Sequence, residues 1–183
     1  MIEGVSLLVL LTMVALWMIW AHRGLIKAKG EVYTRWAVVE DVLERRDDLI
    51  AALSRAVQGH MGRDAQSGAR VERLVKRCRE AYGAGDVARA EDELLAEVAE
   101  LLHVLTLSPG AISDPEAADL PGRIARLDAK ADEMAQEYNT AATQLNVLVE
   151  AFPSRLAARM YGFGRVDYYE PQKPGTRQRG EWI

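Results

Sequence analysis

The chain opens with an uninterrupted apolar run. Residues 4–21 contain no charged side chain and consist mainly of Val, Leu, Met, Ile and Trp. As an α-helix rising about 1.5 Å per residue, this run would span roughly 27 Å, close to the thickness of a bilayer's hydrocarbon core. A buried core helix seldom stays apolar on every face over this length. The pattern therefore predicts a transmembrane helix. Representative anchor residues are Val5, Leu8, Leu11, Trp17 and Trp20.

The flanks of the apolar run favour an anchor that is not cleaved. Glu3 precedes the run, whereas a secretory signal carries positive charge before its apolar part and small residues at its end. Two tryptophans, which favour the membrane interface, close the run, and Arg23, Lys27 and Lys29 follow. By the positive-inside rule, we expect an N-terminus outside and a cytoplasmic body. Because this bias rests on three charges, the reverse topology stays open.

A heptad-like pattern follows in residues 32–57. Positions 32, 36, 39, 43, 46, 50, 53 and 57 are spaced alternately by four and three, and read Val, Trp, Val, Leu, Arg, Ile, Leu, Val. Such spacing places all of these side chains on one helix face. It predicts a long amphipathic helix whose apolar, coiled-coil-like seam contains one arginine.

The same spacing returns over residues 124–152 and predicts a second long amphipathic helix. Two shorter amphipathic segments lie between the long ones, one at residues 71–78 and the other at residues 94–105. Four such helices bury their apolar faces by packing together. We therefore expect an all-α chain, in which an N-terminal transmembrane helix is followed by an antiparallel bundle of long helices.

Turn-forming residues divide the middle of the chain. Glycines are frequent in residues 59–68 and 83–85, and Asp86 is a candidate N-cap for the helix that follows. Residues 114–116, Asp-Pro-Glu, have the pattern of a helix start, and Pro121 is expected to kink or restart that helix.

The C-terminal end has its own punctuation. Residues 152–154, Phe-Pro-Ser, should end the last long helix and permit a short one, which Gly162 should terminate. Residues 170–183 are polar and rich in Pro and Gly, which predicts a disordered tail. The expected organisation is an anchor with its basic flank over residues 1–30, a helical bundle over residues 31–169, and this tail.

Composition narrows the function classes. The net charge of the whole chain is −4, and beyond residue 30 there are 20 Lys and Arg against 26 Asp and Glu. The positive field on which nucleic-acid binding relies is therefore missing. Phosphate-binding loops, zinc-protease motifs and serine-hydrolase motifs are missing too. We expect no enzymatic activity, no catalytic residue, no metal and no cofactor.

The single cysteine, Cys78, cannot form an intramolecular disulfide, and with three scattered histidines it does not make the usual zinc site. Basic neighbours such as Arg79 would lower the pKa of its thiol. A buried thiol on an apolar helix face is nevertheless the more common arrangement.

Several polar residues fall on or beside the two seams. A buried guanidinium at position 46 requires carboxylate or carbonyl acceptors, so it is either a structural arginine satisfied by another helix or part of a partner-binding surface. Asn139 and Asn146 are seven residues apart and so share a helix face. There they would hydrogen-bond Arg46 or hold a loop, and a ligand site is the less expected alternative. A tyrosine on the second seam should lie in the core with its hydroxyl hydrogen-bonded. The candidates are Arg45, Arg46, Asp48, Tyr138, Asn139 and Asn146.

An aromatic-rich segment near the C-terminus is the strongest interaction candidate. It carries more apolar surface than one short helix and a loop normally bury. It either folds back on its own bundle or packs on a neighbouring subunit, and we favour the former because Phe-Pro-Ser should turn the short helix back. The candidates are Phe152, Pro153, Tyr161, Phe163, Tyr168 and Tyr169.

Two parts of the chain resemble the LemA family. The first runs from Trp36 to Gly59 and contains L-E-R-R-D-D-L-I. The second combines Y-N at 138–139, N at 146, F-P-S at 152–154, G-F at 162–163 and Y-Y-E at 168–170. The resemblance implies a membrane-anchored antiparallel helical bundle of the bacterial inner membrane, with no established catalytic activity.

We therefore expect a structural or interaction scaffold that acts at the membrane by self-assembly. Its expected partners are the lipid bilayer, further copies of the chain and other membrane proteins. Two classes stay open beside it. One is an adaptor or regulator of a membrane protease or envelope-stress system, and the other is a ligand-binding sensor.

Overall fold

The computed structural model describes residues 2–61, 65–107 and 118–172, and all the regular structure in these ranges is helical. The all-α prediction is therefore confirmed. The helices are α1 (Ile2–Met61), α2 (Ala65–Glu80), α3 (Ala84–Leu107), α5 (Leu120–Glu150) and α6 (Ser154–Met160).

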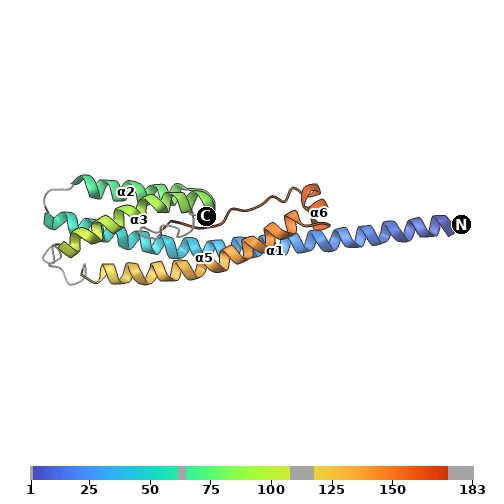
Figure 1. The fold of residues 1–183 in the computed structure, drawn as a ribbon, viewed down its shortest axis with the longest axis horizontal. Coiled ribbons are helices and arrows are strands. Elements are labelled where there is room, and N and C mark those ends of the chain that lie inside the picture. Colours follow the sequence, from blue (N-terminus) through green and yellow to red (C-terminus); the bar gives the residue numbers. More distant parts are fainter. Residues whose placement is uncertain (1, 62–64, 108–117, 173–183) are drawn as a thin grey trace, which may run out of the picture.

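The apolar run and the first bundle helix are one continuous helix. α1 contains 60 residues, which corresponds to a length of about 90 Å. Its N-terminal part projects beyond the bundle (Figure 1), and the apolar side chains there, Val5, Leu8 and Leu11 among them, are exposed. By length and composition this end of α1 fits a membrane anchor and equally a signal sequence.

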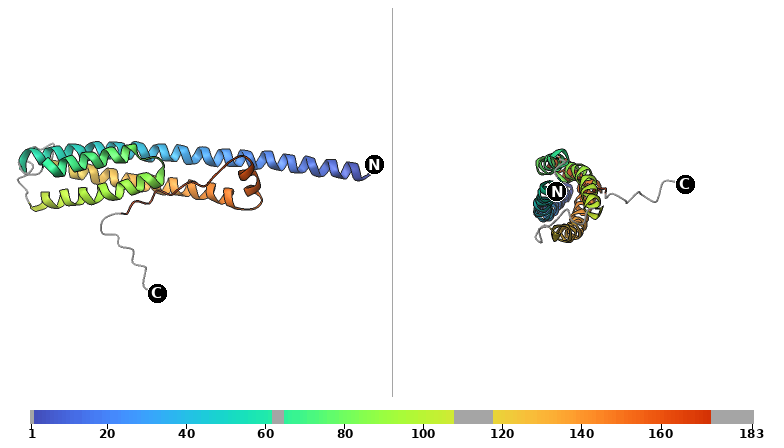
Figure 2. Two further views of the ribbon diagram at one scale, coloured as in Figure 1. Left: turned by 90° about the horizontal axis from the view of Figure 1, so that it is seen from above. Right: turned by 90° about the vertical axis from the view of Figure 1, so that its left-hand side faces the viewer.

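The other long helices pack on α1 in alternating directions. α5 runs antiparallel to α1 along most of the bundle, and α2 and α3 form a hairpin over the end of α1 that is far from the apolar run (Figures 1 and 2). Seven of the eight seam positions between residues 32 and 57 are buried and Trp36 is half-buried, as the periodicity predicts.

Two hydrophobic clusters divide the core along its length. The distal cluster contains mainly Ile, Leu and Val side chains from α1, α2, α3 and the start of α5. The proximal cluster, nearer the apolar run, lies between α1 and α5 and is rich in alanine. There, α6 and the extended C-terminal segment, residues 163–172, cover the helix pair together with the first turns of α3, which contribute Ala84, Val87 and Ala88 (Figure 2).

Two turn signals differ from the helix boundaries: the glycine-rich stretch at 59–68 reaches into α1 and α2, and the start of α3 differs from the expected N-cap. The Val87 N–H donates to the Gly83 carbonyl oxygen at 3.0 Å, so α3 begins before Asp86. The N-cap prediction for Asp86 is wrong: this residue lies inside the first turn, where its carboxylate pairs with Arg89. Gly83 has a φ of 82°, which is why a glycine makes this tight turn.

The signals at the two ends of α5 are confirmed. Pro121 lies in the first turn of α5, where a missing N–H costs nothing, so a helix begins at this proline. After α5, the short helix α6 ends at Met160, and Gly162 follows it with a φ of 71°, which glycine readily adopts. The helix start predicted at residues 114–116 lies outside the described residues, and of the tail only residues 170–172 are described.

Candidate functional site

A buried ionic cluster joins three helices at the boundary between the two halves of the core. Arg46 of α1 is buried, and its Nη2 donates to the Asp47 carboxylate at 3.0 Å and also to Glu91 of α3. Its Nη1 donates to Asp128 of α5 at 3.3 Å. We call Arg46, Asp47, Glu91 and Asp128 the Arg46 cluster. The interpretation of Arg46 as a structural arginine satisfied by another helix is confirmed.

Three carboxylates around one guanidinium set the charge of this cluster. Burial by itself would lower the pKa of Arg46, but the negative charges of Glu91, Asp47 and Asp128 raise it above its usual value. Arg46 therefore stays protonated. Burial and, less strongly, the charge of Glu91 raise the pKa of Asp47 to about 6, against the opposing effect of Arg46.

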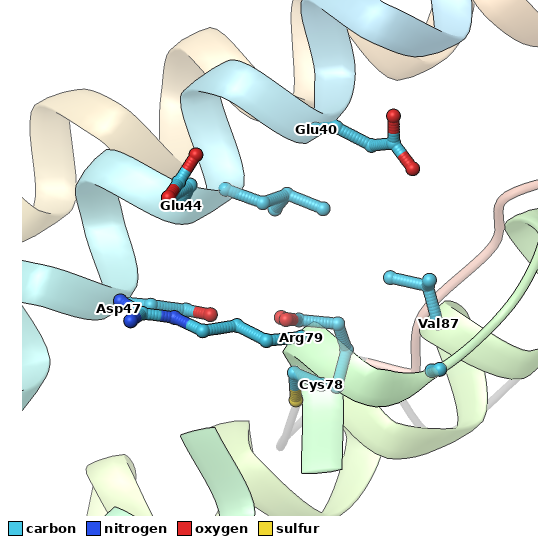
Figure 3. A pocket seen from close by; sticks show the side chains of 9 residues that line it. Glu40, Glu44, Asp47, Cys78, Arg79 and Val87 are labelled. Atoms are coloured by element: carbon cyan, nitrogen blue, oxygen red, sulfur yellow. The ribbon is translucent and has the colours of Figure 1, made fainter. Parts of the chain in front are cut away.

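A cavity of about 300 Å³ adjoins the cluster between α1, α2 and α3. In Figure 3, Glu40 and Glu44 come from α1 on one side, and Cys78 and Arg79 come from α2 on the other. Glu91 also lines the cavity; its Oε1 has no nitrogen or oxygen partner among the described residues. The lining side chains are Glu40, Leu43, Glu44, Asp47, Cys78, Arg79, Ala81, Val87 and Glu91.

Cys78 lines this cavity, but its thiol is not activated. It is buried, and both that burial and the nearby charge of Glu91 raise its pKa above the usual value. The expectation of a buried thiol on an apolar helix face is confirmed, and the basic neighbours do not lower the pKa. Among the described residues, no three His, Cys, Asp or Glu side chains are grouped to hold a metal ion.

The two charged candidates beside Arg46 in the sequence, Arg45 and Asp48, lie outside the cluster. Arg45 is exposed and pairs with Asp41, one turn earlier in the same helix, at 2.8 Å. Asp48 is exposed as well and pairs with Arg79 of α2 at 2.6 Å. Their proximity to Arg46 in the sequence does not bring them into one site, because successive residues of a helix point in different directions.

The two asparagines bind the C-terminal segment. Asn146 donates from Nδ2 to the Val166 carbonyl at 3.0 Å, and its Oδ1 accepts from the Val166 N–H at 2.9 Å. Asn139 makes the same pair of bonds with Tyr169, each at 2.9 Å. Each side-chain amide thus supplies the donor and the acceptor that a neighbouring strand would supply in a sheet. The prediction that these asparagines hold a loop is confirmed, and the alternative of a bond to Arg46 is wrong.

The spacing of these asparagines matches the geometry of the two elements. Seven residues of α5 cover about 10.5 Å along the helix. Three residues of extended chain, from Val166 to Tyr169, cover about 10 Å. A segment running antiparallel to α5 therefore meets Asn146 first and Asn139 three residues later.

Aromatic residues complete this contact. Tyr138 is buried and its hydroxyl donates to the Asp167 carbonyl at 2.7 Å, which confirms the prediction of a core tyrosine with a bonded hydroxyl; burial raises its pKa to about 12. The Trp36 ring lies 5.0 Å from the Tyr138 ring and 5.6 Å from the Tyr169 ring, between centroids. Tyr169 is buried, and Tyr168 and Phe163 are half-buried.

The aromatic candidates therefore divide into two groups. Phe163, Tyr168 and Tyr169 fold back on the bundle, and the Tyr161 ring lies 4.1 Å from His22 of α1. Phe152 and Pro153, which are joined by a cis peptide bond, are exposed at the end of α5. Folding back on the bundle, the favoured alternative, is confirmed for the first group only.

Glu91 and Asp128 are site residues that sequence analysis missed. A signal for Glu91 was available: with Val87, Leu94 and Val98 it completes a four-and-three spacing, so it occupies an apolar seam just as Arg46 does. Two opposite charges on the seams of different helices are natural partners. Asp128 is partly exposed and lies beside its seam, and nothing in the local pattern distinguishes it.

Comparison with known proteins gives one family match, which covers the bundle and its C-terminal segment. The family model of the LemA family matches residues 35–180, a span that contains both the Arg46 cluster and the asparagine-held segment. A comparison with curated proteins returned no match. The family match spans well over half of the chain and begins after the apolar run. The chain therefore belongs to the LemA family.

Proposed function

We propose that this protein is a membrane-anchored scaffold of the bacterial inner membrane, which acts through contacts of its helical bundle with other proteins and first of all with copies of itself. The observation that carries the proposal is the continuity of α1. One helix contains both the apolar run and a buried face of the bundle. The bundle is therefore held rigidly to the span and not through a flexible linker.

Packing at the end of the apolar run supports an anchor that is retained. Ala21 and Leu25 are buried in the proximal cluster, and Trp17 and Met18 pack against it. Cleavage near the end of the run would remove or expose these side chains, at roughly 1.5–3 kcal/mol for each large one. A cleaved signal sequence would not be built into the core of the mature protein.

Anchoring gives the bundle its mechanism. Confinement to a membrane raises the effective concentration of the bundle, so lateral contacts that are weak in solution suffice to assemble it or to recruit a partner. The 40 residues of α1 after the run extend about 60 Å along the bundle. In the proposed topology, the N-terminus lies outside and the bundle lies in the cytoplasm, on the side of Arg23, Lys27 and Lys29. A rod of this shape offers long side surfaces for such contacts.

The test is the mass of the full-length protein in mild detergent, measured by multi-angle light scattering. The matched control is a chain that begins at residue 17, which keeps Trp17, Ala21 and Leu25 but lacks most of the run. A large defined oligomer of the full-length protein alone supports the scaffold. If both forms are monomers, self-assembly is contradicted. The protein would then be better explained as an adaptor, and one dominant partner should co-purify with it.

A second candidate function, a ligand-binding sensor, is favoured by the cavity beside the Arg46 cluster. Four carboxylates line it against one guanidinium, and Glu91 Oε1 has an unused acceptor site. These groups suit a small cation such as an alkylammonium ion. Putrescine should then raise the melting temperature of the wild type but not of Glu44→Gln, with Glu137→Gln, outside the cavity, as control. No shift in the wild type would contradict the sensor.

A further inference from the structure

The short helix α6 lies at the level where α1 leaves the apolar run. Ala157 and Ala158 of α6 are fully buried in the proximal cluster, which also contains Ala21 and Leu25 of α1. The Tyr161 ring, just after α6, stacks 4.1 Å from the His22 ring of α1. Figures 1 and 2 show α6 at the end of the bundle from which the N-terminal part of α1 projects.

The face of α6 that points away from the bundle is apolar. Leu156 and Met160 are spaced by four residues on α6 and are 51% and 60% exposed. Phe152, just before the helix, and Tyr161, just after it, are exposed too. We call these four side chains the α6 patch. The helix α6 packs its alanines against the bundle and exposes its large apolar side chains to the surroundings. A helix in water usually does the reverse.

The direction of α5 places this patch toward the membrane. α5 runs antiparallel to α1, so its C-terminal end points to the apolar end of α1 (Figure 1). Phe152 follows that end directly. The run itself stops at Ala21, and Trp17 and Trp20 mark the interface. If α1 crosses a bilayer as proposed above, α6 therefore lies at the surface of that same bilayer.

Exposed positive charges lie on the same elements as the patch. Arg155 and Arg159 are exposed on α6, and Arg23 and Lys27 are exposed on α1 shortly after the apolar run. The Lys29 ammonium lies 5.6 Å from the centre of the Phe163 ring, in the same region. Exposed cations beside large apolar side chains are the combination by which interfacial helices bind anionic lipid surfaces.

We propose that α6 is a second membrane contact. The α6 patch inserts into the boundary between headgroups and acyl chains of the leaflet that α1 enters, and Arg155 and Arg159 bind the phosphates of anionic lipids. This proposal rests on the anchor proposed above. With two attachment points, the bundle has a set depth and rotation about α1, so that the same side surfaces of neighbouring molecules face one another in the membrane.

The test uses the full-length protein in vesicles that contain lipids with a nitroxide on the acyl chain, which quenches a fluorophore only at short range. A fluorophore is attached to a single introduced cysteine, in a Cys78→Ser background. The three positions are Leu156→Cys in the patch, Leu11→Cys in the run, and Tyr82→Cys, which is 92% exposed in the turn between α2 and α3. We expect quenching at positions 156 and 11 and none at 82.

The three positions separate the two proposals. Quenching at 11 without quenching at 156 would overturn the membrane contact of α6 and leave the anchor intact. No quenching at 11 would contradict the anchor itself. If the fluorophore at 156 shifts to the blue with rising protein density, without lipid quenching, a second copy of the chain covers the patch and the proposal is wrong.

Charge provides an independent arm of the test. Vesicles with about a third of phosphatidylglycerol should quench position 156 more strongly than vesicles of phosphatidylcholine alone, because anionic lipid attracts Arg155 and Arg159. The double variant Arg155→Gln/Arg159→Gln should remove that difference. The matched control, Arg70→Gln/Arg73→Gln on α2, should keep it. An identical loss in both would contradict a role of the α6 arginines.

Discussion

The two halves of the bundle share the helix pair α1 and α5 but cover it in different ways. In the distal half, α2 and α3 supply two more helices, which satisfy their own backbone hydrogen bonds and contribute Ile, Leu and Val side chains. In the proximal half, only the first turns of α3 take part, a short helix and an extended segment cover the rest, and that segment has no strand beside it. From Val166 to Tyr169 its backbone therefore depends on side chains of α5.

This difference explains why the polar residues of the two halves differ in kind. The Arg46 cluster joins helices whose backbones are already satisfied, so charged side chains bind charged side chains. Asn139 and Asn146 bind backbone, so each needs one donor and one acceptor, which an amide has and a carboxylate does not. The following predictions test this contrast from the largest expected effect to the smallest.

Arg46→Ala should destabilise the bundle most. The change leaves Glu91 and Asp47 as buried charges without their partner, which costs about 3–5 kcal/mol for comparable buried pairs. Thermal unfolding followed by circular dichroism measures the loss. Arg45→Ala is the matched control, because its exposed pair with Asp41 contributes at most about 1 kcal/mol. Equal melting temperatures for the Arg46 variant and the wild type would contradict a structural role.

Asn146→Leu should release the C-terminal segment but leave the distal half intact. It leaves the N–H and the carbonyl of Val166 without partners, at about 1–3 kcal/mol for each group that stays buried. Hydrogen exchange of residues 163–170 should become faster, whereas exchange in α2 and α3 should not change. Gln144→Leu, an exposed position on the same helix, is the control. Faster exchange in both halves would show that the two regions are not separate.

Asp47→Asn should change how the distal half responds to pH. The pKa of Asp47 is raised to about 6 in the folded state, above about 4 in an unfolded chain, so the folded state binds more protons between these values. The contribution of this group is therefore fully present below pH 4 and is lost as pH rises through 6. Relative to Asp47→Asn, the wild type should lose about 2 kcal/mol of stability across this window.

Unfolding in urea at several pH values between 3.5 and 7 measures that difference. The sign is what matters, because a carboxylate stabilised mainly by Arg46 would have a lowered pKa and would gain stability as the pH rises. If the wild type became more stable relative to Asp47→Asn as the pH rises, the raised pKa of Asp47 would be contradicted. Asp48→Asn, with its exposed carboxylate, is the control.

Gly85→Ala should have the smallest effect and connects the two halves. A Cβ at Gly85, in the first turn of α3, would lie 3.1 Å from the Asp167 carboxylate of the C-terminal segment. The Asp167 carboxylate lies close to the N-terminus of α3, where a negative charge is stabilised by the helix dipole. The added methyl group would displace this carboxylate. Gly30→Ala meets nothing within 4 Å and should stabilise α1 by about 0.5–1 kcal/mol. Gly85→Ala should lack that gain, as unfolding in urea would show.

Local pattern was sufficient for the elements of this fold. Each seam needs only the spacing of apolar residues within one helix, and seven of the eight seam positions from Val32 to Val57 are accordingly buried. Local pattern was misleading at Asp86, because the chain had already become helical one turn earlier. It also showed no reason to join the apolar run to the first bundle helix, since Gly24 and Gly30 both weaken a helix.

The sequence by itself determined the helices, the apolar run and the need of Arg46 for a buried acceptor, because periodicity, length and desolvation are properties of one segment at a time. Only the tertiary structure decided that the acceptor is Glu91, that two asparagines hold Val166 and Tyr169, and that α6 lies against Ala21. These contacts join residues that are far apart in the chain. Their choice depends on which faces the packed helices bring together, and no local pattern contains that information.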